Sequence, residues 1–236
     1  MRKTVNILYL IPGLGIGGAE KVVLTLCRKI HRERFNLSLM YWNEDDLLAP
    51  IRETGTDVVK LNPAGILSLR TVLEIRRYIR KRSIDLIHTH FMDADLLGCL
   101  AGLLSRTPVL IHVHSYPFPA AGRHGVRYRW MSRFAHKLLC VSNRVRQFVL
   151  SRTGIPAGKC EVLYNGIEVS NRFGEKSEET KRALKRSLGI DEGSVVVGNV
   201  SRLIPDKGHE FLLEAAAEVV KELPQTKFLI VGDGIL

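Results

Sequence analysis

Short apolar segments alternate with amphipathic segments of about ten to fifteen residues along most of this 236-residue chain. The apolar segments include Val5–Ile11, Val58–Leu61 and Val109–Val113. Such runs are typical of strands that are covered on both faces, and their alternation with helices predicts a doubly wound parallel α/β sheet. The predicted helices of this sheet are Ala19–His31, Leu67–Arg82, Asp93–Leu104, Gly125–Ala135 and Asn143–Arg152.

The same pattern predicts a second Rossmann-like domain that is incomplete. We expect the first domain over residues 1–167, a polar linker and a helix over 168–190, and the start of the second domain over 191–236. This last part holds a single strand-helix-strand unit, which would leave strand edges unpaired and an apolar face poorly covered. The chain is therefore expected to be truncated in its C-terminal domain, and independent activity of such a piece is doubtful.

Composition excludes several classes of protein. With 45% apolar and 25% charged residues, the chain is ordinary for a soluble globular protein. The longest apolar run, Leu96–Leu104, is well short of the roughly 20 residues that a membrane-spanning helix needs. The four cysteines are scattered and form no C-x-x-C pair, which predicts reduced thiols in a cytoplasmic protein.

The positive charge is gathered in two places. The formal net charge is +11, no acidic residue lies between Asp95 and Glu161, and a second group of cations ends the predicted helix at residues 76–82. Such clusters suit an anionic membrane surface, although solubility alone or nucleic acid would also account for them. Because no aromatic-interleaved RNA motif or recognition helix accompanies the charge, we predict a peripheral protein at the inner face of the membrane and no nucleic-acid partner.

A glycine-rich turn follows the first predicted strand. Gly13, Gly15 and Gly18 satisfy G-x-G-x-x-G before a helix, the spacing of dinucleotide-binding loops. The acidic partner expected about 20 residues later is not cleanly supplied, since Glu44 and Asp45 come late. The turn therefore leaves open a nicotinamide-dependent enzyme, another phosphate ligand, or a tight turn that needs glycine.

A second turn, Gly198–Gly208, connects a predicted strand to an amphipathic helix over about Lys207–Glu222. Such turns point free backbone N–H groups and the positive end of the helix dipole at one spot. Arg202 and Lys207 add two cations beside it. The combination predicts a site for an anion of about two negative charges.

Two His-x-His pairs, His88/His90 and His112/His114, close two consecutive strands. Alternate residues share a face of a strand, and ligands of open α/β sheets bind beyond the carboxyl ends, so these imidazoles are expected at a cleft. No carboxylate or cysteine is spaced with them, and we predict no metal site. The literal D-x-D at Asp93 and Asp95 opens a helix, where we interpret both residues as helix caps.

These segments together resemble the retaining glycosyltransferases of the two-Rossmann GT-B architecture, specifically glycosyltransferase family 4. The resemblance covers the whole chain, and its most specific parts are Gly198–Gly208 and Phe228–Gly234. The other segments that carry it are Gly17–Glu20, Ile84–His90, His112–Ser115, Cys140–Ser142 and Asn165–Ile167. The glutamate pair that the family carries later in its second domain has no counterpart here.

The resemblance implies metal-independent transfer of a sugar, with retained configuration, from a nucleoside-diphosphate sugar to a glycan or lipid-linked acceptor, as in polysaccharide biosynthesis. No cofactor is expected. His114 would contact the transferred sugar at the reaction centre. The implied donor-binding residues are Gly17, Gly18, Gly198, Arg202, Lys207 and Gly232, and the implied acceptor-side residues are Glu20, His88, His90 and Tyr116. The alternatives are a nicotinamide-dependent Rossmann enzyme, a sugar-nucleotide epimerase, and a noncatalytic remnant that binds a membrane or a partner.

Overall fold

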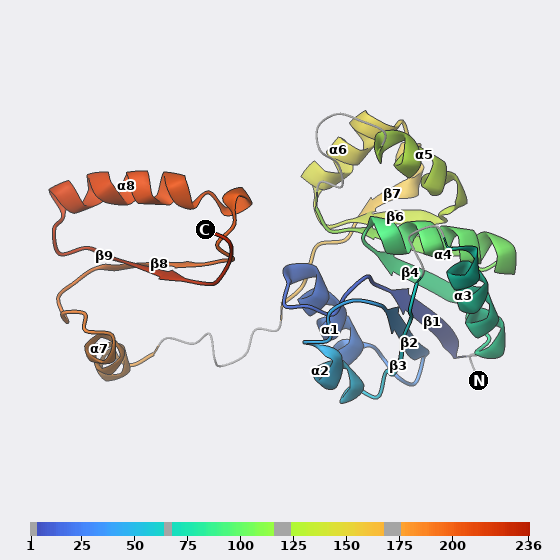
Figure 1. Cartoon of the computed structure of the whole chain (residues 1–236), viewed down its shortest axis with the longest axis horizontal. Helices are drawn as coiled ribbons and strands as arrows, with labels where there is room; N and C mark the ends of the chain where they lie inside the picture. The colour runs from blue at the N-terminus through green and yellow to red at the C-terminus, as the bar shows by residue number, and fades with distance from the viewer. Residues whose placement is uncertain (1–3, 64–67, 116–123, 168–175) are drawn as a thin grey trace. The chain divides into compact units, whose positions relative to one another are not determined.

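The computed structural model describes residues 4–63, 68–115, 124–167 and 176–236. The chain divides into two compact units, residues 1–168 and 169–236, and each has the α/β organisation that the sequence predicts (Figure 1).

The first unit is built on a seven-stranded, wholly parallel sheet in the order β3-β2-β1-β4-β5-β6-β7. The order reverses between β1 and β4, and in sheets of this kind ligands bind beyond the carboxyl ends of the strands at such a reversal. The strands are β1 (Val5–Leu10), β2 (Phe35–Tyr41), β3 (Asp57–Lys60), β4 (Leu86–His90), β5 (Val109–Val113), β6 (Lys137–Cys140) and β7 (Cys160–Val162).

Helices cover both faces of this sheet, because side chains alternate along each strand. On β1, Leu8 and Leu10 join a core with α3 and α4, whereas Ile7 and Tyr9 join a second core with α1. The doubly wound prediction is therefore confirmed. The helices are α1 (Gly18–Lys29), α2 (Leu48–Arg52), α3 (Leu69–Lys81), α4 (Met92–Ser105), α5 (His124–Phe134) and α6 (Asn143–Thr153), with the 3-10 turn η1 (Ala157–Lys159).

The second unit holds one strand-helix-strand motif preceded by a helix. Its strands, β8 (Val196–Val200) and β9 (Lys227–Val231), pair in parallel as a two-stranded sheet. The remaining elements are α7 (Glu178–Ser187), the 3-10 turn η3 (Pro205–Lys207) and α8 (His209–Glu222). Large apolar side chains are left in solvent, including Val200 at 81% and Phe211 at 75% exposure, as the prediction of a poorly covered apolar face requires.

Two local features differ from the sequence-based expectation. The helix α2 was not predicted; it has only five residues, and its place is fixed by the fully buried Ile51. Strand β4 begins at Leu86 rather than Ile84. Ser83 adopts a left-handed conformation, the Ile84 amide donates back to the Ile79 carbonyl of α3, and the pairing of β4 with β1 begins at Leu86.

The four cysteines are free and buried, in agreement with the prediction. Among residues 4–63, 68–115, 124–167 and 176–236, no helix combines the length and the hydrophobicity that a membrane crossing requires.

Candidate functional site

The loop between β1 and α1 brings glycines to the switch point of the first unit. Gly17 is the N-cap of α1 and Gly18 its first residue, and a Cβ atom added to Gly18 would have no neighbour within 4 Å. The side chain of Glu20, in the first turn, folds back against Gly17. The start of α1 therefore has open space beside Gly18, whereas the Glu20 carboxylate lies against Gly17, where a bound anion would have to displace it.

The other two glycines of the G-x-G-x-x-G pattern pack against protein instead. A Cβ atom at Gly13 would lie 2.0 Å from Glu44 Oε2, and one at Gly15 would lie 3.6 Å from Glu44 Cβ. The Leu14 amide also donates to the Glu44 carbonyl at 2.9 Å. A carboxylate against these two glycines is a poor neighbour for a pyrophosphate, so the loop does not support a dinucleotide site.

Four histidines gather at the carboxyl ends of β4 and β5. The parallel register sets His90 directly beside His112, and His88 and His114 extend the group along the two strands. Ring centroids are 4.5 Å apart for His88 and His90 and 4.2 Å apart for His112 and His114. His90 Nδ1 lies 2.8 Å from His114 Nε2, so one of these two nitrogens donates to the other. We call these four residues the histidine cluster.

Burial sets the charge of this cluster. Desolvation lowers the pKa of His88 and of His112 to about 3, that of His114 to about 4, and that of His90 well below its usual value. All four imidazoles are therefore neutral at pH 7. His114 is therefore not a cation; its Nε2 is bonded to His90, and its Nδ1 is buried with no partner among the described residues.

The acceptor-side role expected for two of these residues needs correction. His90 has no exposed surface and is bonded to His114, and His88 is only 7% exposed. A direct contact of His90 with an acceptor is not supported, because its side chain lies inside the unit. Tyr116, another expected acceptor-side residue, lies outside the described residues.

A pocket of about 210 Å³ lies beside His114. Asp95 and Tyr128 line it together with Phe91, which precedes α4 and has φ of 71° and ψ of 154°. That conformation is costly for a residue with a Cβ atom, and strain of this kind is concentrated at functional sites. The pocket is therefore the best-defined cavity next to the expected reaction centre.

Asp95 is a functional candidate that the sequence did not reveal. Asp93 and Asp95 do lie in the first turn of α4, as expected, but neither caps it, because the N-cap is Phe91 and no side chain caps the helix. Asp95 instead turns inward, where its carboxylate accepts from Thr89 Oγ1 at 2.5 Å and Tyr128 Oη at 3.4 Å. Burial raises the pKa of Asp95 to about 8.

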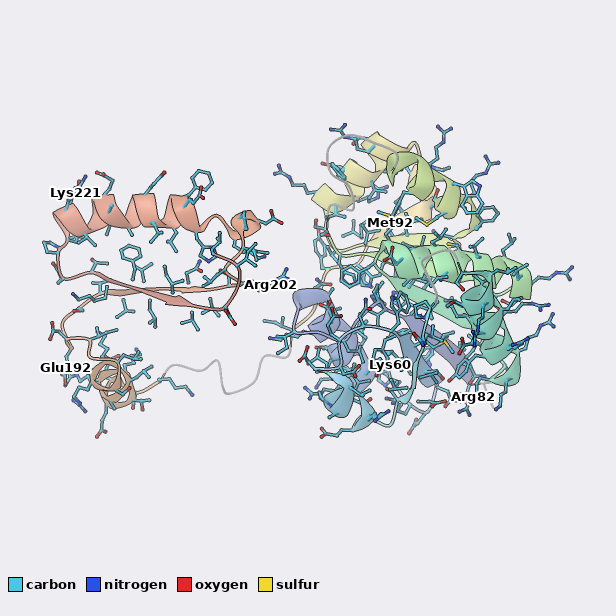
Figure 2. All side chains as sticks on the ribbon, in the orientation of Figure 1. Lys60, Arg82, Met92, Glu192, Arg202 and Lys221 are labelled. Atoms are coloured by element: carbon cyan, nitrogen blue, oxygen red, sulfur yellow. The ribbon has the colours of Figure 1, made fainter. Side chains whose placement is uncertain are left out.

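In the second unit, the segment from Ser201 to Gly208 joins β8 to α8, and we call it the basic turn. Arg202 and Lys207 are both exposed, and among the described residues neither side chain makes an ion pair or a hydrogen bond. Arg202 lies in the loop after β8, next to the start of α8 (Figure 2). Gly208, at φ 68°, is the N-cap of α8 and adds no side chain to the helix start.

A small hydrogen-bond network holds the basic turn in place. Ser201 Oγ donates to Asn199 Oδ1 at 2.8 Å, and the buried His209 Nε2 lies 3.0 Å from Ser201 Oγ. Because the serine proton is used for Asn199, the histidine nitrogen is the donor in the second bond. The network ties the end of β8 to the first turn of α8, and sequence periodicity gave no signal for it.

The two other predicted donor-site glycines differ in their surroundings. At Gly232 a Cβ atom would lie 1.9 Å from the Ser201 carbonyl oxygen, so this glycine lets the loop after β9 reach the basic turn. At Gly198, on β8, no atom lies within 4 Å of the added Cβ.

Some of the clustered cations have structural partners. Lys159 donates to carbonyl oxygens at the end of α5, Arg146 to that of Cys160, and Lys137 pairs with Glu161. In the second group, Arg82 pairs with Asp57. The expected cationic surface for an anionic membrane is thereby reduced. Among the described residues, the exposed Arg129 and Arg133 line a pocket of about 380 Å³ together with Ser132, Gly154, Ile155, Pro156 and Lys159.

Comparison with known proteins decides among the interpretations left open by the sequence. The family model described as Glycosyltransferase Family 4 matches residues 16–171, and the one described as Glycosyl transferases group 1 matches residues 180–235. The chain belongs to glycosyltransferase family 4. Membership in this family favours neither a nicotinamide-dependent enzyme nor an epimerase.

Among curated relatives, the UDP-Gal:α-D-GlcNAc-diphosphoundecaprenol α-1,3-galactosyltransferase of Escherichia coli is 27% identical over 94% of this chain and 60% of its own length. The chain therefore spans about 60% of the length of this relative.

Solved structures confirm the fold. Anabaena HepE in complex with UDP and glucose is similar with a TM-score of 0.79 at 24% identity, over 98% of this chain and 61% of that protein. A glycosyltransferase from Rickettsia africae gives a TM-score of 0.81 at 20% identity, over 98% of this chain and 61% of that protein. The predicted GT-B-like α/β class is confirmed.

Proposed function

We propose that this family 4 chain belongs to a glycosyltransferase that moves a sugar from a nucleoside-diphosphate sugar to a glycan or lipid-linked acceptor. The observation that carries the proposal is the basic turn, in which two exposed cations flank a helix start. In support, HepE was solved with UDP, and the Escherichia coli relative acts on a sugar linked to diphosphoundecaprenol.

The basic turn suits a diphosphate leaving group. As the glycosidic bond breaks, negative charge accumulates on the departing diphosphate, and preorganised cations and helix N–H groups stabilise it in the transition state. Arg202 and Lys207 supply the cations and the start of α8 the N–H groups, each charged contact contributing about 1.5–3 kcal/mol. Transfer in this proposal is metal-independent and retains the anomeric configuration.

The first unit would supply the reaction-centre histidine. His114 borders the pocket that Asp95 and Tyr128 line, and in this proposal its unpartnered Nδ1 would hydrogen-bond a sugar hydroxyl without adding charge near a developing oxocarbenium ion. Gly18 leaves room at the start of α1 for an anionic group, which would require the Glu20 carboxylate to turn away from Gly17.

The experiment is to measure release of nucleoside diphosphate from UDP- and GDP-sugars, with lipid-linked acceptor and EDTA, in the intact protein. Arg202→Ala and Lys207→Ala should each slow transfer about tenfold to a few hundredfold. Turnover within about twofold of wild type in both variants would refute the assignment of the basic turn.

The membrane-facing role rests on the pocket lined by Arg129, Arg133 and Lys159. We expect cosedimentation with anionic vesicles that falls at high salt, where the screening length is about 3 Å near 1 M. Arg129→Ala/Arg133→Ala should weaken binding more than Lys21→Ala/Arg34→Ala, which removes two exposed cations elsewhere. Equal binding to neutral vesicles would contradict this role.

A further inference from the structure

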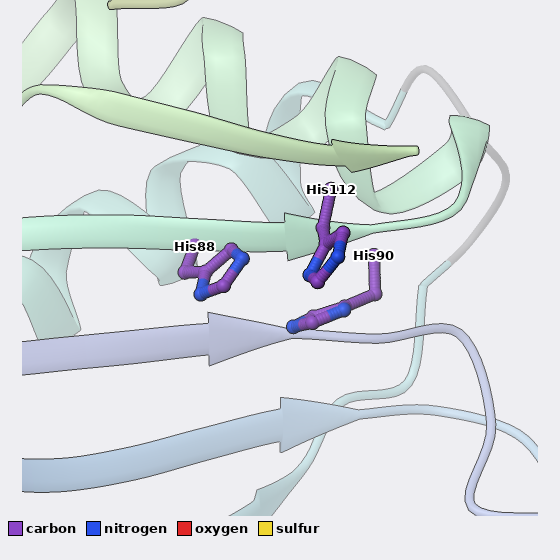
Figure 3. Close-up of side chains that lie close together, drawn as sticks. All are labelled: His88, His90 and His112. Atoms are coloured by element: carbon purple, nitrogen blue, oxygen red, sulfur yellow. The ribbon is translucent and has the colours of Figure 1, made fainter. Parts of the chain in front are cut away.

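Three members of the histidine cluster converge on one small volume. One ring nitrogen from each of His88, His90 and His112 can be chosen so that all three lie within 4.8 Å of one another. His88 and His90 come from β4 and His112 from the neighbouring β5 (Figure 3). Since alternate residues share a strand face and the register pairs His90 with His112, the sheet itself fixes this convergence.

The nitrogens in this volume lack hydrogen-bond partners. His88 Nε2, His90 Nε2 and both ring nitrogens of His112 are buried and unpaired in the described part of the chain. Buried polar atoms without a partner are costly and uncommon, and a group of them points to a bound water or ion that completes the site. Three neutral imidazoles with free lone pairs are the ligand set of a divalent transition metal.

We propose that His88, His90 and His112 form a binding site for one divalent transition-metal ion of the Zn²⁺ class, with at least one coordination position left for water or another ligand. The sequence predicted no metal because no carboxylate or cysteine is spaced with the histidines. A site of three histidines needs neither of these ligands. The site is distinct in its chemistry from diphosphate binding, which we assign to Arg202 and Lys207.

The contacts of His88 and His90 fit such a site, whereas the second ring nitrogen of His112 has no partner among the described residues. A metal-ligating histidine usually donates its second ring N–H to an acceptor, which fixes its tautomer. With His90 Nε2 on the metal, Nδ1–H is available for the 2.8 Å bond to His114 Nε2. Tyr9 packs edge-on against His88 and His90, with ring centroids 5.0 and 5.5 Å away, and limits how far these rings can turn.

The ligand set also predicts which ions bind. Imidazole nitrogens suit Zn²⁺, Co²⁺, Ni²⁺ and Cu²⁺, whereas Mg²⁺ and Ca²⁺ prefer oxygen ligands. We therefore expect Co²⁺ to bind with visible d–d absorption, Zn²⁺ to displace it, and a hundredfold excess of Mg²⁺ to leave the spectrum unchanged.

The experiment titrates the metal-stripped chain with CoCl₂ and then ZnCl₂ at pH 7, without nucleotide, and counts bound metal by elemental analysis after gel filtration. The expected result is one ion per chain. His88→Gln and His112→Gln should each weaken binding at least about tenfold, whereas His136→Gln, which changes an exposed histidine, should not.

Folding of each variant is checked by the fluorescence of Trp42 and Trp130, both in the first unit. If the variants do not fold, the electron paramagnetic resonance spectrum of Cu²⁺ bound to the wild-type chain tests the site instead. Several imidazole ligands would give nitrogen hyperfine structure in that spectrum. Substoichiometric Co²⁺, displacement by Mg²⁺, or unchanged affinity in His88→Gln and His112→Gln would overturn the site. Because no nucleotide is present, such a failure leaves the proposed transferase function untouched.

Discussion

Replacing Asp95 by asparagine should remove a strong pH dependence from the stability of the first unit. The carboxyl group is 1% exposed and is held by Thr89 and Tyr128. Its pKa is raised by burial to about 8 in the folded chain, against about 3.9 for an unfolded chain. Between these values the folded state holds a proton that the unfolded state has released.

The sign and the size of the pH effect on the free energy of unfolding follow from this difference in pKa. A group whose pKa is raised on folding contributes stability that is complete below its unfolded pKa and is lost as the pH rises through the folded value. Across the window from about pH 4 to about pH 8, Asp95 therefore lowers the free energy of unfolding by about 1.4 kcal/mol for each pH unit. Between pH 5 and pH 7 the loss is about 3 kcal/mol.

Asparagine does not titrate and keeps a similar shape. The free energy of unfolding of Asp95→Asn, relative to wild type, should thus rise by about 3 kcal/mol from pH 5 to pH 7. Urea unfolding at pH 5, 6 and 7 measures it, with fluorescence of Trp42 and Trp130 reporting the first unit alone. Asp93→Asn, in the same helical turn but partly exposed, is the matched control. A constant difference between wild type and Asp95→Asn over this range would refute the reasoning.

Two further substitutions test the packing that positions the sites. Gly98→Ala would place a Cβ atom 2.4 Å from Thr89 Cγ2, so we expect urea unfolding to show a loss of about 1–3 kcal/mol in stability. Gly158→Ala is the control, because its Cβ atom would have no neighbour within 4 Å. Equal stability of the two variants would contradict this account. Ser201→Ala would leave the buried His209 Nε2 without its acceptor. Amide hydrogen exchange at the start of α8 should therefore accelerate by an amount equivalent to about 1–3 kcal/mol. Unchanged exchange would argue against the Asn199–Ser201–His209 network.

The fold could be predicted because its signals are local. Strand Val109–Val113 has the predicted bounds, and the predicted helix Asn143–Arg152 differs from α6 by one residue, because apolar runs and cap residues are set by nearby sequence. Ser142, for example, caps α6 by accepting from the Val145 amide. The short helix α2 had no such signal, since its place depends on the burial of one isoleucine.

The sites could be predicted only in part. The sequence placed the His-x-His pairs at strand ends and Arg202 and Lys207 beside a helix start, because these placements follow from strand alternation and turn position. Asp95 was misread, because its inward rotation depends on Thr89 and Tyr128, the latter 33 residues away. The convergence of His88, His90 and His112, on which the proposed metal site rests, likewise depends on the register between β4 and β5. Neither strand segment encodes that register alone.

The central claim is that Arg202 and Lys207 hold the diphosphate of a sugar nucleotide, and calorimetric titration of the chain in EDTA tests it most directly. UDP or GDP should bind more tightly than the corresponding monophosphate. Arg202→Ala and Lys207→Ala should each weaken diphosphate binding about tenfold to 150-fold, whereas Arg182→Ala and Lys221→Ala, which remove exposed cations of α7 and α8, should not. Diphosphate affinity that is the same in Arg202→Ala, Lys207→Ala and wild type would contradict the account.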